Sequence, residues 1–471
     1  MVYISIGFYF FVLCTVILYY LFPMKSRWIV ILLGSVGFYY KVCGKGIIVL
    51  LFTAVFTYII GRLLCKKKKR WILLIGVLLT IVPWLLFKFG LAVTTRISYD
   101  FNWVEPLGIS FYSLQIIAYL TDIYRDEILP KENFAKYLLY IMFFPQIVQG
   151  PIPRYRKLAE DLFKGHKFNE KNVIVGFQKI LWGFFLKLMI ADKAAIIVNA
   201  VFDNSSIYGG FYILIAAILY SIQLYTDFSA CVYISKGISM LYGVHLPENF
   251  LHPYFAVSIK DFWRRWHISL STWLRDYIYI PLGGNRKGIK AVNILITFIV
   301  SGFWHGNGMK YIMWGMLHGI YQIIGEYTKS IRKRIYKIIG ISEYSNIKLV
   351  ISQIGTFFWV TVAWILFRAS SLKKGIQMIY SMFTVFNPEI LFNDSLLTLG
   401  LDWKEWDVLI VAVIILYLVS KKQERESAGY NIADKPLIIR WGIYIVTIIC
   451  IIVFGTYGFG YNVQDFIYGG F

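Results

Sequence analysis

The chain has 471 residues, of which 58% are hydrophobic and only 16% are charged. Soluble domains average about 45–50% apolar and about 25% charged residues, and the mean hydropathy here is +0.62. This composition excludes a water-soluble protein and indicates an all-α, polytopic integral membrane protein. The formal net charge of +22 does not indicate a nucleic-acid partner. The basic residues lie in short loops between apolar segments, as the positive-inside rule for membrane proteins predicts.

Apolar runs along the chain predict the membrane helices. A hydrocarbon core about 30 Å thick takes roughly 20 residues per helix, so we expect roughly 10–13 membrane-embedded helices, re-entrant segments included. The run 134–149 is barely long enough and has basic residues on both flanks, so we expect it to be re-entrant or buried in the protein. The longer runs are 2–22, 28–41, 47–64, 71–93, 173–201, 208–226, 348–368 and 438–459, and the other short or interrupted runs are 108–124, 290–304, 309–328, 373–384 and 407–420.

The distribution of basic residues predicts the orientation. The cluster from Lys66 to Arg70 is the strongest, and the positive-inside rule places it in the cytoplasm. On that basis the inside loops carry 11 Lys and Arg residues and the outside loops carry 3. The inside loops are 23–27, 62–70 and 125–136, and the outside loops are 41–46 and 94–107. We therefore expect a multi-pass protein of the inner or plasma membrane with its N-terminus outside the cytoplasm.

The chain is predicted to form a single membrane domain over 1–471. Helices in 1–93 form an N-terminal scaffold, 105–325 holds all six histidines and forms the core, and 340–471 returns to apolar helices. The first apolar run lacks a basic n-region and a small-residue cleavage site, so we expect a retained span and not a signal peptide. The five cysteines are scattered without C-x-x-C pairing, which indicates neither a disulfide framework nor a zinc site.

The segment 261–286 is too polar and too rich in charge to face lipid, because a central Arg or Asp costs about 2.5–3.5 kcal/mol on insertion scales. As one helix it would place Trp263, His267 and Leu270 on one face. Two interpretations are open: an interfacial amphipathic helix with snorkelling arginines, or the lining of a wet cavity. The candidate residues in it are Arg264, Arg265, Trp266, His267, Ser271, Arg275 and Asp276.

A second polar segment, 301–306, follows an apolar run and contains Trp304 and His305 between two glycines. An ionisable residue at membrane depth is a functional hypothesis by default, and the ordinary pKa of histidine suits proton transfer at neutral pH. The alternative is a histidine that hydrogen-bonds between packed helices. His318, thirteen residues further on, lies in an apolar run and indicates a structural or cavity-lining residue.

Several kinds of site lack their sequence signatures. A metal site made from His267, His305 and His318 has no ligand spacing such as H-E-x-x-H, so we expect no metal. The chain contains no G-x-S-x-G and no P-loop, which argues against a serine hydrolase and nucleotide-driven transport. The Pro- and Gly-containing segment 144–154 breaks any helix, and it is either a plain loop or a shaped part of an active-site funnel.

Three stretches in this order resemble the membrane-bound O-acyltransferase (MBOAT) superfamily. They are PQIVQGPIPR, the segment around DFWRRWHISLSTWLRDYIYIPLGGNR, and SGFWHGNGMKYIMWGMLHG, within 144–319. The resemblance implies the MBOAT fold with a central tunnel, and it implies that His305 is the catalytic histidine. His267 stands at the family's second polar position, 38 residues earlier.

The resemblance is closest to the bacterial branch of alginate O-acetyltransferases and teichoic acid D-alanyl transferases. The segment 357–383 looks like a phrase of the alginate type, which favours acetyl transfer to an extracytoplasmic cell-surface polysaccharide over D-alanylation. The implied donor is acetyl-CoA or another acyl thioester, with no bound cofactor, and the implied partners are membrane lipid and an extracytoplasmic SGNH-type acetyltransferase. A transporter of polysaccharide or lipid-linked sugar is the rival from another class.

In the mechanism that the resemblance implies, His305 is a general base or a transient acyl acceptor, and His267 orients it or polarises the thioester carbonyl. Weaker expectations concern the residues around them. Arg264, Arg265 and Arg275 would attract the phosphates of the donor, although snorkelling explains them equally well. The other residues expected to line the tunnel or bind substrate are Trp266, Ser271, Asp276, Trp304 and His318.

Overall fold

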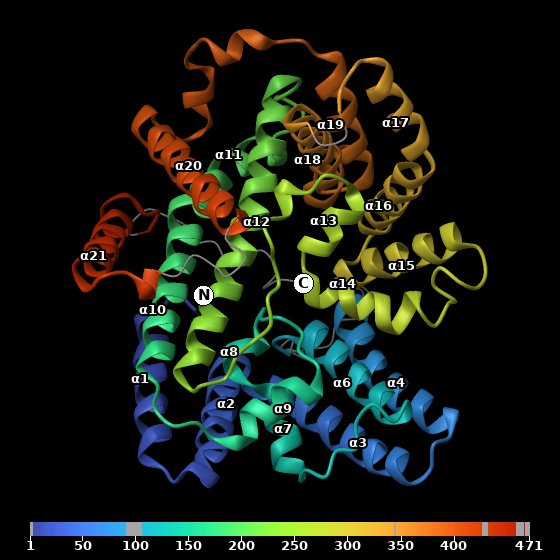
Figure 1. The fold of residues 1–471 in the computed structure, drawn as a ribbon, viewed down its shortest axis with the longest axis vertical. Coiled ribbons are helices and arrows are strands. Elements are labelled where there is room, and N and C mark those ends of the chain that lie inside the picture. Colours follow the sequence, from blue (N-terminus) through green and yellow to red (C-terminus); the bar gives the residue numbers. More distant parts are fainter. Residues whose placement is uncertain (1–2, 91–105, 343–344, 426–431, 458–465, 467–471) are drawn as a thin grey trace, which may run out of the picture.

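The computed structural model describes residues 3–90, 106–342, 345–425, 432–457 and 466. These residues form helices joined by short loops, and none of them forms a strand (Figure 1). The predicted all-α fold is thereby confirmed. The predicted loop 94–107 lies almost entirely outside the described residues.

Within residues 3–90, the N-terminal part of the chain folds into four α-helices. Ser5 caps the first helix, because its hydroxyl oxygen accepts from the backbone N–H of Phe8 at 3.2 Å. The second ends at Gly44, whose φ of 49° a residue with a side chain rarely adopts. The helices are α1 (Ile6–Leu21), α2 (Arg27–Cys43), α3 (Ile47–Lys66) and α4 (Arg70–Leu85), which continues into the π-helix η3 (Leu86–Gly90).

The middle of the chain contains the most buried helices. In α7 and α8, which correspond to the predicted run 134–149, all residues from Tyr137 to Ile147 are buried, so this segment is enclosed by protein as expected. The elements are α6 (Ile109–Tyr124), α7 (Phe134–Met142), α8 (Phe144–Ile147), α9 (Tyr155–Lys164), α10 (Glu170–Phe184), the π-helix η4 (Phe185–Ala191), α11 (Asp192–Asp203), α12 (Phe211–Leu241), α13 (Ile259–Arg265), α14 (Ile268–Leu274), the π-helix η6 (Arg275–Tyr279), α15 (Lys290–His305) and α16 (Met309–Tyr327).

The C-terminal helices run over the top of the view in Figure 1, from α17 at the upper right to α21 at the left. The first is short and strongly basic, and the last exposes most of its surface: Ile438, at one end of it, is 87% exposed. Such apolar exposure is stable only against lipid. The helices are α17 (Lys329–Ile338), α18 (Asn346–Arg368), α19 (Leu372–Thr384), α20 (Trp403–Arg425) and α21 (Leu437–Phe454).

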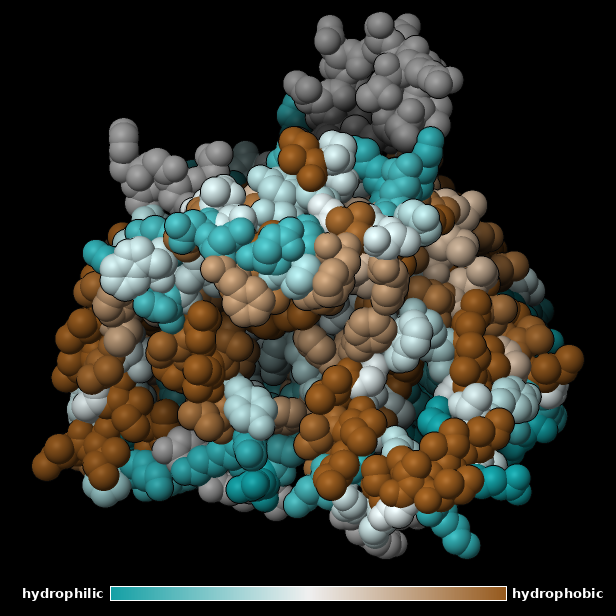
Figure 2. Space-filling model, turned by 90° about the horizontal axis from the view of Figure 1, so that it is seen from above, coloured by the Kyte–Doolittle hydropathy of each residue, from teal (hydrophilic) through white to brown (hydrophobic). Residues whose placement is uncertain are grey.

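Six segments of the described chain are long and apolar enough to cross a membrane. The first, Met24–Lys66, contains both α2 and α3. Several other apolar helices, such as α1 and α15, are shorter than a full span and complete the membrane-embedded part. Figure 2 shows brown, hydrophobic surface across the middle of one side of the molecule, with most of the teal surface above and below it. This arrangement matches a bilayer core between two polar interfaces.

Buried charges join α12 to the neighbouring π-helix η4. The ammonium group of Lys187 lies 2.9 Å from Asp192 and 2.7 Å from Asp227, and all three side chains are at most 2% exposed. The insertion of a π-turn re-aims a side chain within a helix and often occurs at special positions. Here η4 directs Lys187 toward α12, so that each buried charge has an oppositely charged partner, as burial requires.

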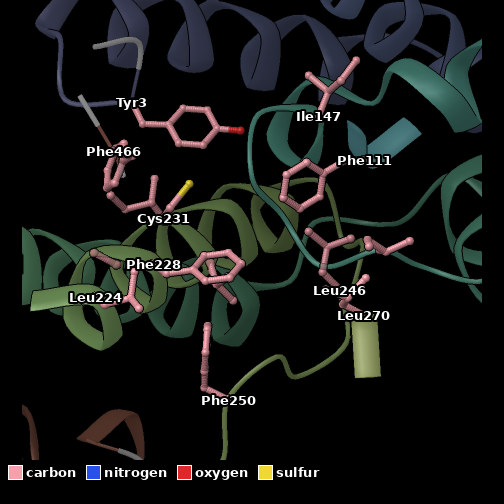
Figure 3. Close-up of a cluster of buried hydrophobic side chains, with 14 of the residues drawn as sticks. Tyr3, Phe111, Ile147, Leu224, Phe228, Cys231, Leu246, Phe250, Leu270 and Phe466 are labelled. Atoms are coloured by element: carbon pink, nitrogen blue, oxygen red, sulfur yellow. The ribbon is translucent and has the colours of Figure 1, made fainter. Parts of the chain in front are cut away.

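A cluster of apolar side chains from distant parts of the sequence forms the core between α8, α12 and α14 (Figure 3). Tyr3 donates to the carbonyl oxygen of Pro145 at 2.8 Å. Its ring lies 6.5 Å from that of Phe466, edge to face, and the Phe466 ring also faces the ammonium of Lys187 at 4.7 Å. The two ends of the described chain therefore meet inside the protein, next to the buried ion pairs.

Helices α15 and α16 approach each other closely because glycines face one another across their contact. A Cβ added at Gly302 would lie 2.3 Å from the carbonyl oxygen of Tyr311, and one added at Gly315 would lie 2.2 Å from that of Phe298. Small residues of this kind allow close backbone packing between membrane helices. The two helices carry His305 and His318, so this packing sets the distance between the histidine-bearing faces.

Candidate active site

The segment around His267 is not one continuous helix. The capping hydroxyl of Ser258 starts α13, which ends at Arg265, and α14 starts after His267. His267 itself has φ 42° and ψ 54°, a left-handed conformation that is uncommon for a residue with a side chain. The prediction that Trp263, His267 and Leu270 share one helical face is therefore wrong, because the chain turns at His267. Strained backbone of this kind is found preferentially at functional sites.

Asn249 holds the turn at His267 in place. Its side-chain oxygen accepts from the backbone N–H and the hydroxyl of Ser269, at 3.1 and 2.8 Å. The backbone carbonyl oxygen of Asn249 accepts a hydrogen bond from the backbone N–H of Ile268 at 2.9 Å. Both Asn249 and His267 are 0% exposed. The sequence analysis did not single out Asn249, which lies in a loop and has no helical spacing to His267.

The same contact fixes which nitrogen of His267 carries the proton. Nδ1 of His267 lies 3.3 Å from the side-chain oxygen of Asn249. That atom is the oxygen of the amide, because the backbone N–H of Ser269 can only donate to it. Nδ1 of a neutral His267 therefore carries the proton, and Nε2 is left as an acceptor. Among the described residues Nε2 has no hydrogen-bond partner, so its lone pair is available to a substrate or to another side chain.

Aromatic rings surround His267 and connect it to His305. The ring of Phe228 lies 4.8 Å from the imidazole of His267, and the ring of Phe111 lies 6.3 Å from it. Trp304 contacts both histidines, with centroid distances of 6.1 Å to His267 and 4.8 Å to His305. The structure thus brings His267 next to Trp304 and His305, which lie more than 35 residues later in the sequence.

His305 is the last residue of α15 and is 2% exposed. Its ring contacts Trp314 of α16 at 5.0 Å and Phe367 of α18 at 5.5 Å. Lys88 of η3 donates to the carbonyl oxygen of Trp304, which places a cation at the C-terminal end of this helix, where the helix dipole is negative. Lys88 is a second residue to which the sequence did not point, because it lies inside the apolar run 71–93.

His318 lies in the same aromatic region but has a different hydrogen-bond role. The indole N–H of Trp263 donates to Nδ1 of His318 at 3.3 Å. Because an indole only donates, Nδ1 is the acceptor and Nε2 carries the proton of a neutral His318. Trp314 contacts both His318 and His305. The ring centroids are 5.1 Å apart for His318 and 5.0 Å apart for His305. His318 is therefore buried among the same tryptophans as His305.

The C-terminal phrase WILFRA packs onto this region from α18. Trp364 stacks on Trp314 at 5.4 Å, and both are 0% exposed. Lys310 at the start of α16 donates to the carbonyl oxygens of Phe367 and Ala369, at 3.2 and 2.7 Å. The phrase is thus a wall of the histidine region, and its charged residue, Arg368, donates to Asn199 and Asp203 of α11 at 2.6 and 3.1 Å.

The segment 144–154 lies next to Phe111, on the His267 side of the histidine region. A small pocket is lined by Phe111, Gln115, Gln146 and Gly150 among others, and Phe111 is the ring that stacks on His267. Gln146 donates to the side-chain oxygen of Gln115 at 3.2 Å, and Gln115 donates to the carbonyl oxygen of Tyr140 at 2.6 Å. The Gln115 amide thus satisfies the carbonyl oxygen of Tyr140 near the end of α7, just before the proline-containing segment.

The charged candidates of the segment 261–286 lie outside the histidine region. Arg264 and Arg275 are exposed. Arg265 pairs with Asp261 at 3.2 Å and Glu424 at 2.8 Å. Asp276 accepts from Arg275 and from Arg154, both at 2.8 Å. The structure therefore places Arg265, Arg275 and Asp276 in ion pairs and Arg264 at the surface, separate from the buried histidines.

Trp266 and Ser271 pack against or bond to neighbouring protein groups near His267. Trp266 is 1% exposed and stacks on Phe262 at 5.4 Å, and it packs against Trp364 at 5.2 Å. The hydroxyl of Ser271 donates to the carbonyl oxygen of Trp266 at 3.1 Å. Both residues support the turn that carries His267 and do not approach the imidazole themselves.

The chemistry of the site follows from these contacts. Within the part of the chain that the structure describes, no group of three or more His, Cys, Asp or Glu side chains is placed to hold a metal ion. The buried polar groups next to Trp304 are two imidazoles, which can accept and return a proton.

The fold is that of a polytopic helical membrane protein, and two buried histidines flank Trp304 inside it. The sequence pattern of the membrane-bound O-acyltransferase family, MBOAT, matches residues 92–337, which hold both histidines. The chain belongs to this family, and it is an O-acyltransferase.

Relatives of known name fall into three groups. The probable alginate O-acetylase AlgI of Pseudomonas fluorescens is 34% identical over 379 residues, which cover 78% of this chain and 72% of that protein. The peptidoglycan O-acetyltransferase of Helicobacter pylori is 34% identical, with 59% of this chain and 57% of that protein covered. The teichoic acid D-alanyltransferase of Bacillus subtilis is 30% identical, with 56% and 69% covered.

Proposed function

We propose that the protein moves an acetyl group from a thioester donor, acetyl-CoA, to a cell-surface polysaccharide outside the cytoplasm. The observation that carries this proposal is the buried pair of His267 and His305 on either side of Trp304. The similarity to the probable alginate O-acetylase, which covers 78% of this chain, supports acetyl transfer to a polysaccharide. The similarity to a D-alanyltransferase covers less of this chain, and so favours D-alanylation less.

In the proposed reaction His305 is the general base. Its imidazole takes the proton from a hydroxyl group of the acceptor, and the hydroxyl oxygen forms a bond to the carbonyl carbon of the thioester. The carbon–sulfur bond then breaks, and the imidazolium returns the proton to the leaving thiolate. The ester and the free thiol are the two products, so atoms and charge balance. A base of this kind contributes about 10²–10⁴-fold to the rate.

His267 is proposed to orient the reacting groups. Asn249 leaves Nε2 of His267 as an acceptor, so the neutral ring has no N–H left with which to polarise a carbonyl group. Of the two roles that the family resemblance implies, this contact supports the orienting one. Nε2 of His267 would accept a hydrogen bond from an N–H or O–H group that approaches along the face of Trp304.

The predicted orientation of the chain is also part of the proposal. Loops that are predicted to be cytoplasmic lie together: Lys68 pairs with Asp126, and Arg27 donates to the carbonyl oxygen of His166. We propose that this face is cytoplasmic, that the protein lies in the plasma or inner membrane, and that the N-terminus is outside. Transfer to the polymer would be direct or would pass through an extracytoplasmic SGNH-type acetyltransferase, and a central tunnel would connect the two sides.

The experiment is to replace His305 by alanine in the full-length protein and to measure acetate esters on the cell-surface polysaccharide. We expect normal accumulation of the protein in the membrane and a loss of esters of at least about a hundredfold, because the proton acceptor is missing. His245→Ala is the matched control, since that imidazole is 55% exposed at the surface and its loss should leave the ester level unchanged.

Other outcomes of the same experiment separate the alternatives. Wild-type ester levels in His305→Ala would contradict the catalytic assignment. Loss of D-alanine esters with acetate esters intact would identify a D-alanyl transferase. Disappearance of the polysaccharide itself from the cell surface would support a transporter, whereas a polymer that is exported without esters supports the enzyme.

A further inference from the structure

A large groove lies away from the histidines, between α13, α16, α17 and α18. Its volume is about 1010 Å³, and these four helices gather in the upper right part of Figure 1. Its charged lining is almost entirely basic: the described residues that line it include one carboxylate, Glu326, which pairs with Lys290. The basic side chains around the groove are Lys260, Lys329, Arg332, Lys333 and Lys348.

The short helix α17 has two different faces, and one of them belongs to the groove. Lys329, Arg332, Lys333 and Tyr336 line the groove, with the spacing of one helical face. The other face carries Ile331, Ile335 and Ile338, which are 59, 50 and 77% exposed. A helix with a basic face and an exposed isoleucine face lies in the membrane interface, with its apolar side in the acyl-chain boundary.

The opposite wall of the groove is apolar and faces lipid. Ile324 of α16 is 52% exposed, and Leu349, Ile351 and Trp359 of α18 are 45, 45 and 49% exposed, and all four line the groove. A ligand that filled this space would meet cations at one end and aliphatic and indole surface along the side. A water-soluble phosphate compound would leave the apolar wall uncovered, whereas a lipid would cover it.

The geometry points to a site for an anionic phospholipid. The phosphate group would lie among Lys329, Arg332 and Lys333, and an acyl chain would lie along Ile324 and Trp359. Part of the polar end is already ordered, because Arg332 donates to the carbonyl oxygen of Gly325 at 2.7 Å and to the hydroxyl of Thr328 at 2.8 Å. Basic pockets between membrane helices commonly bind lipid headgroups in this way. The inference does not depend on the acetyl-transfer proposal.

The test uses the purified full-length protein in detergent and native mass spectrometry with added phosphatidylglycerol. The triple substitution Lys329→Gln, Arg332→Gln and Lys333→Gln should weaken binding by about a hundredfold, at roughly fivefold for each cation near the membrane surface. The reversed set Lys329→Arg, Arg332→Lys and Lys333→Arg keeps the charge and should retain the bound lipid. An unchanged melting temperature of each variant shows that the fold is intact.

The control is a matched loss of three charges on the exposed loop Lys66–Lys69, by Lys66→Gln, Lys67→Gln and Lys69→Gln. It should reduce binding by no more than a few fold, because that loop is not part of the groove. Equal loss in this control would overturn the inference, as would equal binding of phosphatidylcholine. Binding of inorganic pyrophosphate at least as tightly as phosphatidylglycerol would identify a soluble phosphate ligand and would also overturn it.

Discussion

A single amide side chain, Asn249, determines what His267 can do. Its oxygen accepts from Ser269 and from His267, and so keeps the histidine in a strained turn with one tautomer. A histidine without this partner would be free to change its tautomer and its ring orientation. Asn249 is therefore a positioning residue for the proposed reaction.

The Asn249→Ala variant tests this role. It removes the acceptor of three buried donors, and we expect acetyl transfer to fall on the order of a hundredfold through kcat, with KM little changed. Asn249→Asp keeps an acceptor oxygen and should restore a large part of the rate. The measurement is steady-state acetyl transfer by protein whose amount and melting temperature are checked. A rate loss that merely follows the loss of folded protein would assign Asn249 a structural role only.

At the scale of single residues, the sequence pointed to His305 and did not point to Asn249. His305 is recognisable because a polar side chain interrupts an apolar run, and such an interruption is costly at membrane depth. Asn249 lies in a polar loop, where an asparagine is ordinary. Its importance arises only after the chain turns at His267, and no spacing in the sequence encodes that turn. The roles of His267 and His305 themselves stay predictions until the substitutions are made.

At the scale of helices, the contact between α15 and α16 is the most sensitive to added volume. We predict that Gly302→Ala lowers stability by about 1–3 kcal/mol, because the new methyl group would lie 2.3 Å from a backbone oxygen that cannot move away. Displacement of α15 would also move His305. Thermal unfolding in detergent and acetyl transfer should both be measured.

Gly325→Ala is the matched control on α16, since a Cβ added there has nothing within 4 Å. It should leave unfolding and activity unchanged or stabilise the helix slightly. An equal effect of both substitutions would show that the loss comes from glycine flexibility in general and not from the close packing of the two helices.

Helix boundaries were predicted less well than the helices themselves. The run 208–226 predicts a helix that ends at residue 226, yet α12 continues to Leu241. The hydropathy falls there because Asp227, Ser229 and Ser235 are polar, but all three are buried against protein. A hydropathy pattern detects contact with lipid, and it cannot detect a helix whose polar side chains are satisfied by neighbouring helices.

At the scale of the whole molecule, the orientation is testable with two cysteines. Lys45 and Lys67 flank α3, whose 20 residues span about 30 Å, the thickness of a bilayer core. In a version with the five native cysteines replaced by serine, a membrane-impermeant maleimide should label Lys45→Cys in intact cells. Lys67→Cys should be labelled only after the membrane is permeabilised. Labelling of both in intact cells would contradict the proposed topology.

The fold class was predictable from composition because lipid leaves so few alternatives to helices. The lateral order of those helices was not, because lipid-facing sequences resemble one another and the contacts that fix the order involve few residues. The glycine contacts of α15 with α16 and the ion pairs of Lys187 with Asp192 and Asp227 are examples. These residues are in contact in the structure, but no pattern in the sequence predicts that they meet.

The contact of Phe466 with Tyr3 and Lys187 has a practical consequence for work with this protein. Phe466 is 6% exposed and covers the buried ammonium of Lys187. A version of the chain shortened before residue 466 would admit water to the buried charges between η4 and α12. The ion pairs of Lys187 with Asp192 and Asp227 would then be weakened. Affinity tags and reporter fusions are therefore better inserted in the exposed loop after α3, with both ends of the chain left as they are.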